Sequence, residues 1–368
     1  MEIYFDNAAT TLPLAIDGMG FYANPSSPHG LGIEAERIVS FARQDIANAL
    51  GVLPQEIIFT SGGTESNNMA ILGFAFANQR KKVSFVACPW DHPSIIEPLN
   101  FVHSSGIGAV MFAQPNAQTC TAQGPQMAIL SHVNSETGDV NDVTALAKEI
   151  KDANPNAIVM VDGIQSLCKE DINFAHIDAF TFSGHKCHSP AGIGGIIVRN
   201  NLRLMPLVYG GGQERGLRPG TENVSGISAM AKAISHLHAY QQSNYSHVTA
   251  IKNKLLELVT DLPGVTVNAL TSTVSPYILN LSFAGTRGEV LVHSLSSRGV
   301  YAAMGSACKS RSKTKTALEI MGFSSDTAST AVRFSFSHLN TMDEAVAAKE
   351  IIMESVTQMR NVLGVVVT

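Results

Sequence analysis

Short apolar runs alternate with longer amphipathic segments over the first two thirds of the chain. The apolar runs are continuous and end at Gly, Ser, Thr or Asp, which is typical of strands buried on both faces of a sheet. We expect strands in "EIIFT" (56–60), "VSFVAC" (83–88), "AIVMVDG" (157–163), "IDAFTFSG" (177–184) and "GGIIVRN" (194–200). The pattern predicts an α/β fold whose mainly parallel sheet has helices on both faces. Ligands of such sheets bind at the carboxyl ends of the strands.

The pattern changes near residue 224. Two consecutive amphipathic helices are indicated by "VSGISAMAKAISHLHAYQQ" and "HVTAIKNKLLELVTDL". The segments expected after them are a strand (277–283), a helix (288–299), a strand (333–337) and a terminal helix (342–363). We therefore expect a larger domain over residues 14–235, and a smaller α+β domain over residues 1–13 and 236–368.

Composition narrows the classes of function. The 368 residues are 45% hydrophobic and carry a net charge of -5, so the chain offers no electrostatic reason to bind nucleic acid or an anionic membrane. No apolar run approaches the roughly 20 residues needed to span a bilayer, and the first residues do not resemble a signal peptide, which favours a cytoplasmic protein. The five cysteines have no C-x-x-C spacing, so neither a disulfide framework nor a metal site is expected.

The stretch "FTSGGTESNN" (59–68) joins a predicted strand to a predicted helix. Two glycines let the backbone approach a ligand, and a helix that begins near Thr64 would direct free amides and its positive end toward an anion. The stretch is therefore a candidate phosphate site. The simpler alternative is an ordinary turn capped by Thr64.

Two further candidates follow predicted strands. Asp162 ends the apolar run "VMVD", where a partly desolvated carboxylate favours a cationic partner such as a protonated heteroaromatic nitrogen. The alternative for Asp162 is a helix N-cap. Lys186 follows the turn "SGH", and a partly desolvated lysine near other positive charge can form an imine with a carbonyl. Taken alone, Lys186 could equally be a solvated surface group.

Together the three candidates match the attachment points of pyridoxal phosphate (PLP), which are its phosphate, its pyridinium nitrogen and its aldehyde. The chain resembles the class V branch of the fold-type I PLP enzymes, and within it the NifS/IscS-type cysteine desulfurases. That resemblance implies a seven-stranded-type sheet. The matching stretches run in family order from residue 4 to residue 337: "YFDNAATT", "NPSSPHGLG", "EIIFTSGGTESNN", "DHPSI", "SHVNSETG", "VDGIQS", "SGHK", "GGGQERGLRPGTENV", "GSAC" and "RFSFS".

The resemblance implies roles around the cofactor ring. Lys186 would form the Schiff base with PLP, and Asp162 would pair with the pyridinium nitrogen. Gln165 and Asn134 would bond the ring oxygen. His92 would stack on the ring and assist proton transfer.

The resemblance also implies phosphate and substrate contacts. The residues expected to hold the phosphate are Gly63, Thr64, Ser183 and His185. Thr221 would reach the phosphate of the other subunit, which implies a homodimer with shared active sites. Arg333 would clamp the substrate carboxylate with its guanidinium fork, and Asn7 would belong to the same substrate site.

Cys308 is the nucleophile that the resemblance implies. It lies in "GSACKSRSKTK" (305–315), where nearby basic residues would stabilise its thiolate. The implied activity is that of a sulfurtransferase: L-cysteine becomes L-alanine, and a persulfide on Cys308 passes to an acceptor protein. The pathway would be iron-sulfur cluster assembly or the thiolation of transfer RNA or of a cofactor. Cys187, beside Lys186, is expected to pack in the core.

The chain departs from the family pattern after its two substrate-side motifs. The basic stretch after Cys308 stands where the family usually has a Leu-Glu-Pro type segment, and Ser337-His338 stands where it usually has Gly-Arg. Two alternatives stay open. One is another class V lyase, such as a selenocysteine lyase, which would not need Cys308. The other is a catalytically weak, cofactor-binding scaffold.

Overall fold

The chain divides into two compact units. The computed structural model describes residues 1–14, 23–81, 83–121, 127–199, 202–304 and 315–367. The larger unit comprises Leu12–His132 and Asn141–Ala239, and the smaller unit comprises Met1–Thr11, Val133–Val140 and Tyr240–Thr368. In the described part of the chain, no helix combines the length and the apolar character that a membrane crossing requires.

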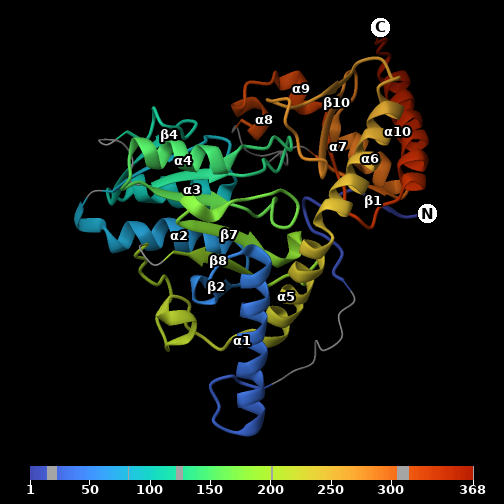
Figure 1. Ribbon diagram of the computed structural model, residues 1–368. Coiled ribbons are helices and arrows are strands. Elements are labelled where there is room, and N and C mark those ends of the chain that lie inside the picture. The colour runs from blue at the N-terminus through green and yellow to red at the C-terminus, as the bar shows by residue number, and fades with distance from the viewer. Residues whose placement is uncertain (15–22, 82, 122–126, 200–201, 305–314, 368) are drawn as a thin grey trace. The chain divides into compact units, whose positions relative to one another are not determined.

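The larger unit is built on a seven-stranded sheet in the order β2-β8-β7-β6-β5-β3-β4 (Figure 1). Strand β8 is antiparallel to both neighbours, and the other neighbouring strands are parallel. The strands are β2 (Ile57–Thr60), β3 (Val83–Ala87), β4 (Gly108–Phe112), β5 (Met127–Ser131), β6 (Ile158–Asp162), β7 (Ala179–Ser183) and β8 (Gly194–Val198). The expected α/β fold with a mainly parallel sheet is confirmed.

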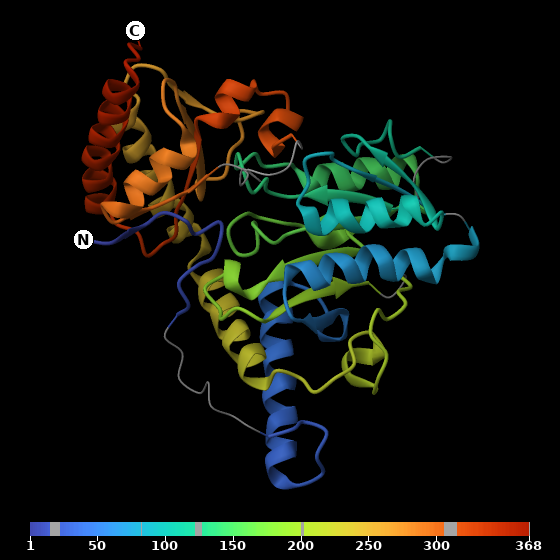
Figure 2. The same ribbon diagram turned by 180° about the vertical axis from the view of Figure 1, so that it is seen from behind.

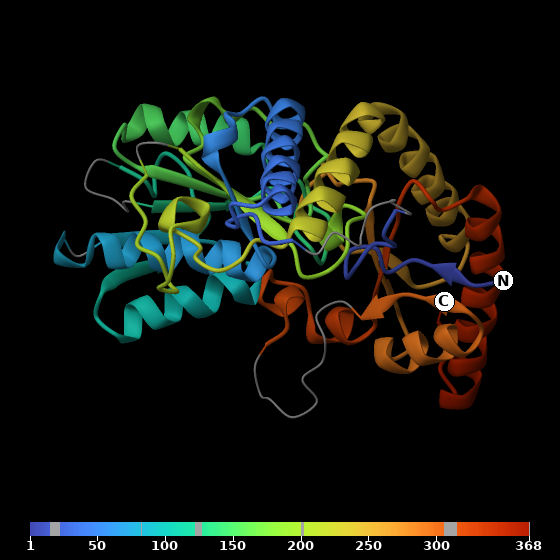
Figure 3. The same ribbon diagram turned by 90° about the horizontal axis from the view of Figure 1, so that it is seen from below.

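Helices cover both faces of this sheet. They are α1 (Gly30–Leu50), α2 (Gly63–Ala77), α3 (Pro93–Ser104), α4 (Val143–Ala153) and α5 (Val224–Ala239), with short 3-10 turns η1 (Pro54–Glu56), η2 (Gln79–Lys81), η3 (Phe174–His176), η4 (Gly184–Lys186) and η5 (Gln213–Gly216). Successive strand residues point to opposite faces. Ile58 packs in the core formed with α2 and α3, whereas Ile57 and Phe59 pack in the core formed with α1, α4 and α5. Figure 3 shows these two layers on either side of the sheet.

The smaller unit contains a four-stranded antiparallel sheet in the order β12-β13-β10-β9 and a parallel pair β1-β11. Its elements are β1 (Ile3–Tyr4), α6 (Gln241–Val259), β9 (Val265–Val267), β10 (Ile278–Phe283), α7 (Gly288–Ser297), β11 (Val300–Tyr301), β12 (Ala303–Met304), α8 (Ala317–Ile320), α9 (Ser325–Ser329), β13 (Ala331–Ser335) and α10 (Met342–Leu363). One face, with Val332 and Phe334, packs against α6, α7 and α10 (Figure 2). Alternation therefore places the polar residues Arg333 and Ser335 on the other face.

Capping residues set the ends of α10 in this unit. The Thr341 hydroxyl accepts a hydrogen bond from the Glu344 amide, and the Glu344 carboxylate accepts one from the Thr341 amide. The helix ends at Gly364, whose φ of 63° is left-handed. Such a capping box and a C-terminal glycine satisfy backbone groups that a helix leaves unpaired.

The segment 133–140 belongs to the smaller unit, although we expected all of 14–235 in the larger domain. The Asp139 carboxylate accepts hydrogen bonds from the amides of Leu270 and Thr271 at 2.7 to 3.0 Å. Asn280 donates to the carbonyl of Glu136 at 3.0 Å. The chain therefore leaves the larger unit after β5 and returns to it before α4. These are polar contacts over a long sequence separation, which apolar periodicity does not reveal.

Candidate active site

The carboxyl ends of β2, β6 and β7 bring the predicted cofactor residues to one edge of the larger sheet. Asp162 is the last residue of β6 and pairs with Thr181 of β7. Ser183 ends β7 and, across the antiparallel strand β8, shares its pairing partner Gly194 with Thr60, the last residue of β2. Lys186 lies three residues beyond Ser183, in η4. The expectation that these polar residues follow the strand ends is confirmed.

The turn between β2 and α2 has the properties of an anion site. Gly62 has a φ of 153°, a conformation that favours glycine. A Cβ on Gly63 would lie 2.3 Å from Ile164 Cδ1, so the turn comes close to the chain that follows Asp162. Helix α2 begins at Gly63, and its first amides have no intrahelical acceptor. The side chain of Thr64 is exposed beside them.

Ser183 supplies an independent sign of an anionic ligand. Its hydroxyl is buried and has no hydrogen-bond partner among the described residues. A Cβ built on Gly62 would lie 3.6 Å from this oxygen, so the hydroxyl faces the same turn. Buried polar groups are normally paired, and an unpaired one calls for a ligand or another explanation. The glycine turn, the α2 N-terminus and Ser183 together fit a phosphate group.

His185 lies two residues beyond Ser183, in η4. Burial lowers the pKa of His185 to about 4, and the charges of Lys186 and Lys169 act in the same direction. The imidazole is therefore uncharged at neutral pH, and one ring nitrogen can donate a hydrogen bond. Cys187 lies in the core beneath, 1% exposed, and burial raises the pKa of its thiol to about 12. The expectation that Cys187 is a packing residue is confirmed.

Asp162 is a buried carboxylate with two fixed donors. It is 8% exposed, and it accepts hydrogen bonds from the Ile164 amide at 2.9 Å and from Asn67 Nδ2 at 3.0 Å. Burial raises the pKa of Asp162, while these donors and the charge of Lys186 oppose that rise, as would a positive charge on His92. A cationic ring nitrogen at this carboxylate would compensate for the cost of its burial. The cofactor ring therefore fits here.

Asn67, Ser94 and Asp91 also belong to this part of the larger unit, although we did not assign them from the sequence. Asn67 and Ser94 are buried and hydrogen-bonded to each other at 2.9 Å. Both occur in stretches that carried the resemblance, "TESNN" and "DHPSI". The sequence did contain one signal for Asn67. It lies four residues after Gly63, and this helical spacing places it on the same side of α2 as the predicted phosphate turn.

Asp91 lies beside Asp162 as a second buried carboxylate. Its oxygens accept hydrogen bonds from Ser131 Oγ at 2.7 Å and from the Cys88 amide at 3.0 Å. Burial raises the pKa of Asp91 to about 7, and the charge of Asp162 adds to the rise. In the unfolded chain an aspartate titrates near its ordinary value of about 3.9. Asp91 therefore takes up a proton on folding at mildly acidic pH.

Replacing Asp91 with asparagine should stabilise the protein at alkaline pH. A raised carboxyl pKa favours folding at low pH, and this contribution is lost as the pH rises toward the folded pKa of about 7. The free energy of unfolding of Asp91→Asn relative to wild type should therefore increase by roughly 2 kcal/mol between about pH 5 and about pH 8. Denaturant unfolding at both pH values measures this difference. The exposed Asp152→Asn on α4 is the control, and an equal pH response in both variants would refute the assignment.

His92 begins helix α3 and lies next to Asp91 in the chain. Its ring is exposed and caps the helix, because Nδ1 accepts a hydrogen bond from the Ser94 amide at 3.1 Å. Gln165 is 8% exposed in the turn after Asp162. Both residues therefore belong to the larger unit, as do Asp162, Lys186 and the phosphate turn.

A strained loop carries Thr221. Glu214 and Arg215 have left-handed backbone conformations, with φ of 47° and 61°. The Glu214 carboxylate is fixed by Arg43 Nη2 at 2.6 Å. Arg218 Nε donates to Glu65 Oε1 at 3.0 Å, which connects the loop to the first turn of α2. Thr221 itself is exposed.

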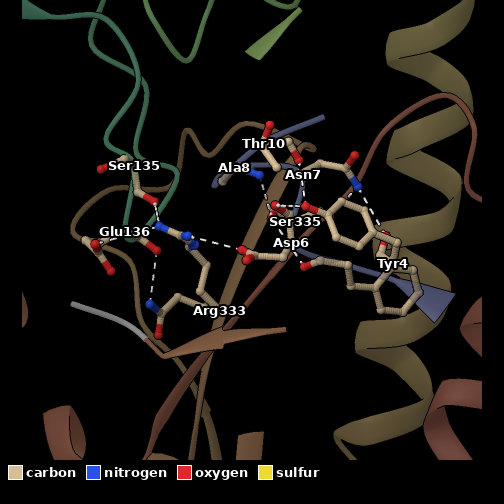
Figure 4. A network of polar contacts seen from close by, with 11 residues as sticks. Tyr4, Asp6, Asn7, Ala8, Thr10, Ser135, Glu136, Arg333 and Ser335 are labelled. Atoms are coloured by element: carbon tan, nitrogen blue, oxygen red, sulfur yellow. Dashed lines mark hydrogen bonds and ion pairs between the residues drawn. The ribbon is translucent and has the colours of Figure 1, made fainter. Parts of the chain in front are cut away.

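Arg333 is the centre of a polar cluster in the smaller unit (Figure 4). Its Nη1 donates to the Ser135 carbonyl at 2.8 Å and lies 3.7 Å from Glu136 Oε1, and its Nη2 lies 3.4 Å from Asp6 Oδ1. Its Nε is buried and has no partner among the described residues. The two ion pairs of the guanidinium are long, and its Nε–H has no acceptor among the described residues. Such a group suits the capture of a carboxylate.

Asn7 and Asn134 organise the backbone of the smaller unit. Asn7 is 2% exposed, and its Nδ2 donates to the carbonyls of Tyr4 and Ser335 at 3.2 and 3.0 Å. Asn134 Oδ1 accepts from the amides of Glu136 and Thr137. Its Nδ2 has no partner within the described ranges and can still donate to an acceptor. No group of His, Cys, Asp and Glu that could hold a metal ion occurs among the described residues.

Cys308 lies outside the described residues. The other four cysteines, Cys88, Cys120, Cys168 and Cys187, are all buried. Burial raises the pKa of each of these thiols. A thiol is nucleophilic only as the thiolate. The four described cysteines are therefore poorly suited to attack a substrate.

Comparison with known proteins agrees with this geometry. Residues 3–347 match the family described as "Aminotransferase class-V". A protein from Lactobacillus delbrueckii subsp. bulgaricus, named "NifS/IcsS protein homolog", is 34% identical, and the match covers 93% of this chain and 94% of that protein. "Cysteine desulfurase IscS" from Vibrio campbellii is also 34% identical, over 98% of this chain and 94% of that protein.

Solved structures give the same result. A structure titled "NIFS-LIKE PROTEIN" superposes with a TM-score of 0.89 at 29% identity, and the match covers 97% of this chain and 100% of the other. A second, "SspA in complex with cysteine", has a TM-score of 0.78 at 28% identity, over 93% of this chain and 100% of the other. At 29% and 28% identity, these two proteins resemble this chain in sequence as well as in fold.

Proposed function

Because this chain belongs to the aminotransferase class-V family, we propose that it is a PLP-dependent cysteine desulfurase. The observation that carries the proposal is the sheet edge where Asp162, Lys186 and the unpaired Ser183 hydroxyl stand at or just beyond the ends of neighbouring strands. These groups match the three attachment points of PLP. Two relatives at 34% identity are named "NifS/IcsS protein homolog" and "Cysteine desulfurase IscS", and these names support desulfuration of cysteine as the reaction.

The residues of the larger unit would bind and orient the cofactor. Gly63, Thr64, Ser183 and His185 would bind its phosphate, and Asp162 would hold a proton on the ring nitrogen through its negative charge. The bound cofactor would supply an electron sink for the α-carbon of the substrate. Lys186 would hold the cofactor through its Nζ and then, once released, accept the α-proton of the substrate. Gln165 and Asn134 would donate to the ring oxygen.

Cys308 would perform the sulfur transfer. Its thiolate attacks the sulfur of cysteine, so a sulfur–sulfur bond forms while the bond from Cβ to sulfur breaks. The electron pair of the broken bond goes to the carbon framework, which takes up a proton and leaves as alanine. The persulfide sulfur on Cys308 then passes to an acceptor, for iron-sulfur cluster assembly or for the thiolation of transfer RNA or a cofactor. The Cys308 thiol must stay reduced in order to attack, and thiols stay reduced in the cytoplasm, which favours that compartment.

The active enzyme is proposed to be a homodimer with shared active sites. Val208 and Tyr209, which precede the Thr221 loop, are 62% and 76% exposed. A second copy of the chain would cover these apolar side chains and bring its own Thr221 to the phosphate. Within a single chain, the loop is held by the hydrogen bonds from Arg43 to Glu214 and from Arg218 to Glu65.

Arg333 is proposed to bind the substrate carboxylate, so Arg333→Lys should weaken substrate binding. Lysine keeps the charge but loses the planar fork that binds a carboxylate at two points. The KM for cysteine should rise about tenfold while kcat changes less. Steady-state alanine release measures both constants. Arg298→Lys, at a surface ion pair with Glu354, is the matched control, and an unchanged KM in Arg333→Lys would exclude this role.

One experiment tests the function itself. Purified protein is given L-cysteine, and alanine, sulfide and the mass of the peptide containing Cys308 are measured. Alanine together with a sulfur adduct on Cys308 is expected. Turnover without the adduct would instead indicate another class V lyase, and absence of turnover would indicate a cofactor-binding scaffold.

A further inference from the structure

Asn67 connects three elements of the larger unit through one buried side chain. It is fully buried in the second turn of α2. Its Nδ2 donates to Asp162 Oδ2 at 3.0 Å and to Ser94 Oγ at 2.9 Å. Its Oδ1 accepts from Thr181 Oγ1 at 2.7 Å. One amide therefore joins the end of β6, the start of α3 and strand β7.

The direction of these hydrogen bonds is set by groups that can act only as donors or only as acceptors. Paired with a cationic ring nitrogen, as proposed above, Asp162 is ionised and can only accept, so the Asn67 amide turns its NH2 toward Asp162. The same NH2 then donates to Ser94 Oγ, and the Ser94 hydroxyl has its own proton left to donate. The acceptor within reach is His92 Nδ1, at 2.8 Å.

A second donor faces the same ring nitrogen. The Ser94 amide donates to His92 Nδ1 at 3.1 Å, and a backbone N–H can only donate. Pro93 precedes it and has no N–H, so the Ser94 amide is the first donor of α3. A proton on Nδ1 would therefore point at a donor and would remove the N-cap of the helix. His92 Nδ1 is an acceptor in this arrangement.

We propose that Asn67 and Ser94 are positioning residues that hold His92 as the neutral tautomer with its proton on Nε2. Resting on the proposed function, this gives His92 a defined role, in which it donates a hydrogen bond from Nε2 and does not act as the first base. The removal of the α-proton of the substrate then falls to Lys186. The contact from Asn67 to Asp162 makes one polar network of the carboxylate and the histidine, the residues assigned to the edge and the face of the ring.

Nitrogen NMR of the holoenzyme tests the tautomer directly. The chain has 12 histidines, so nitrogen-15 histidine labelling gives few signals, and His92→Gln identifies those of His92 by their loss. We expect a protonated Nε2 and an unprotonated Nδ1 at neutral pH. A proton on Nδ1, or on both nitrogens, would overturn the proposal. This measurement needs no substrate, so it can fail or succeed independently of desulfurase activity.

Two pairs of variants test the positioning roles. Asn67→Ala should lower kcat about tenfold with little change in KM, and should shift the cofactor absorption band, because Asp162 loses a donor. Asn68→Ala, one residue further on the same helix, removes only a bond to the Thr64 carbonyl and should leave both unchanged. Ser94→Ala should change the His92 nitrogen signals, whereas Ser94→Thr keeps the hydroxyl and should match wild type.

The Ser94 pair keeps the proposal testable if Asn67→Ala folds poorly. Unchanged His92 signals in Ser94→Ala would refute the role of the hydroxyl. Equal kinetics and spectra in Asn67→Ala and Asn68→Ala would refute the role of the amide. In either case a normal release of alanine by wild type would leave the proposed desulfurase function in place.

Discussion

Lys186→Ala should abolish turnover and leave the cofactor without its covalent attachment. Lys186 lies in η4, directly after β7, in a half-buried position beside the neutral ring of His185. Alanine removes the only group proposed to bond the cofactor aldehyde, and it also removes the proposed acceptor of the α-proton. Because both functions are lost, alanine release from cysteine should fall on the order of 1000-fold or more.

Cofactor retention separates this loss from misfolding. In Lys186→Ala the phosphate turn and Asp162 are intact, so PLP should still bind from solution but should be removed by dialysis, with loss of the yellow colour. Lys148→Ala on α4, whose side chain is 61% exposed, should keep both the colour and the activity. Retention of covalently bound cofactor by Lys186→Ala would refute the assignment of this lysine.

Cys308→Ala should retain the cofactor and lose the sulfur transfer. The cofactor contacts assigned above do not include Cys308, so the absorption spectrum should match that of wild type. The described cysteines are buried and keep their protons, so none of them replaces the missing thiolate. The rate of alanine release should therefore fall on the order of 100-fold or more, and no sulfur adduct should form on the protein.

A second cysteine provides the control for this variant. The Cys88 thiol donates to Gln114 Oε1 at 2.9 Å, and serine can keep that bond. Cys88→Ser should therefore release alanine at the wild-type rate and carry the adduct on Cys308. If Cys308→Ala released as much alanine as wild type, the chain would be a class V enzyme of a different kind.

The sheet of the larger unit was predictable because its strands have a simple pattern. Runs of apolar residues that end at Asp162 and Ser183 reflect burial on both faces, and this same burial puts the polar residues at the strand ends. Strands β4 and β5 were not among the strands that we expected. Strand β4 lies at the sheet edge, and two of its residues, Met111 and Phe112, are 48% and 41% exposed. An edge strand lacks the double burial that makes a continuous apolar run.

The supporting residues of the site were harder to predict. Asn67 acts through partners 27, 95 and 114 residues away in sequence, and local patterns carry no trace of such distances. The acidic partners of Arg333 were missed for the same reason, since Asp6 lies 327 residues from it. Sequence patterns identify the groups that would touch a ligand, whereas the hydrogen bonds that orient those groups depend on the folded chain.

Strand β8 runs against its neighbours, and its first residue sets a fixed distance in the larger unit. A Cβ on Gly194 would lie 2.6 Å from Gly62 Cα and 2.8 Å from the Phe182 carbonyl oxygen, so any side chain here would act as a wedge. The distance between the phosphate turn and the end of β7, which leads to Lys186, is thus set by backbone atoms, with no side chain between them. A side chain at position 194 would therefore push the Gly62 turn away from the end of β7.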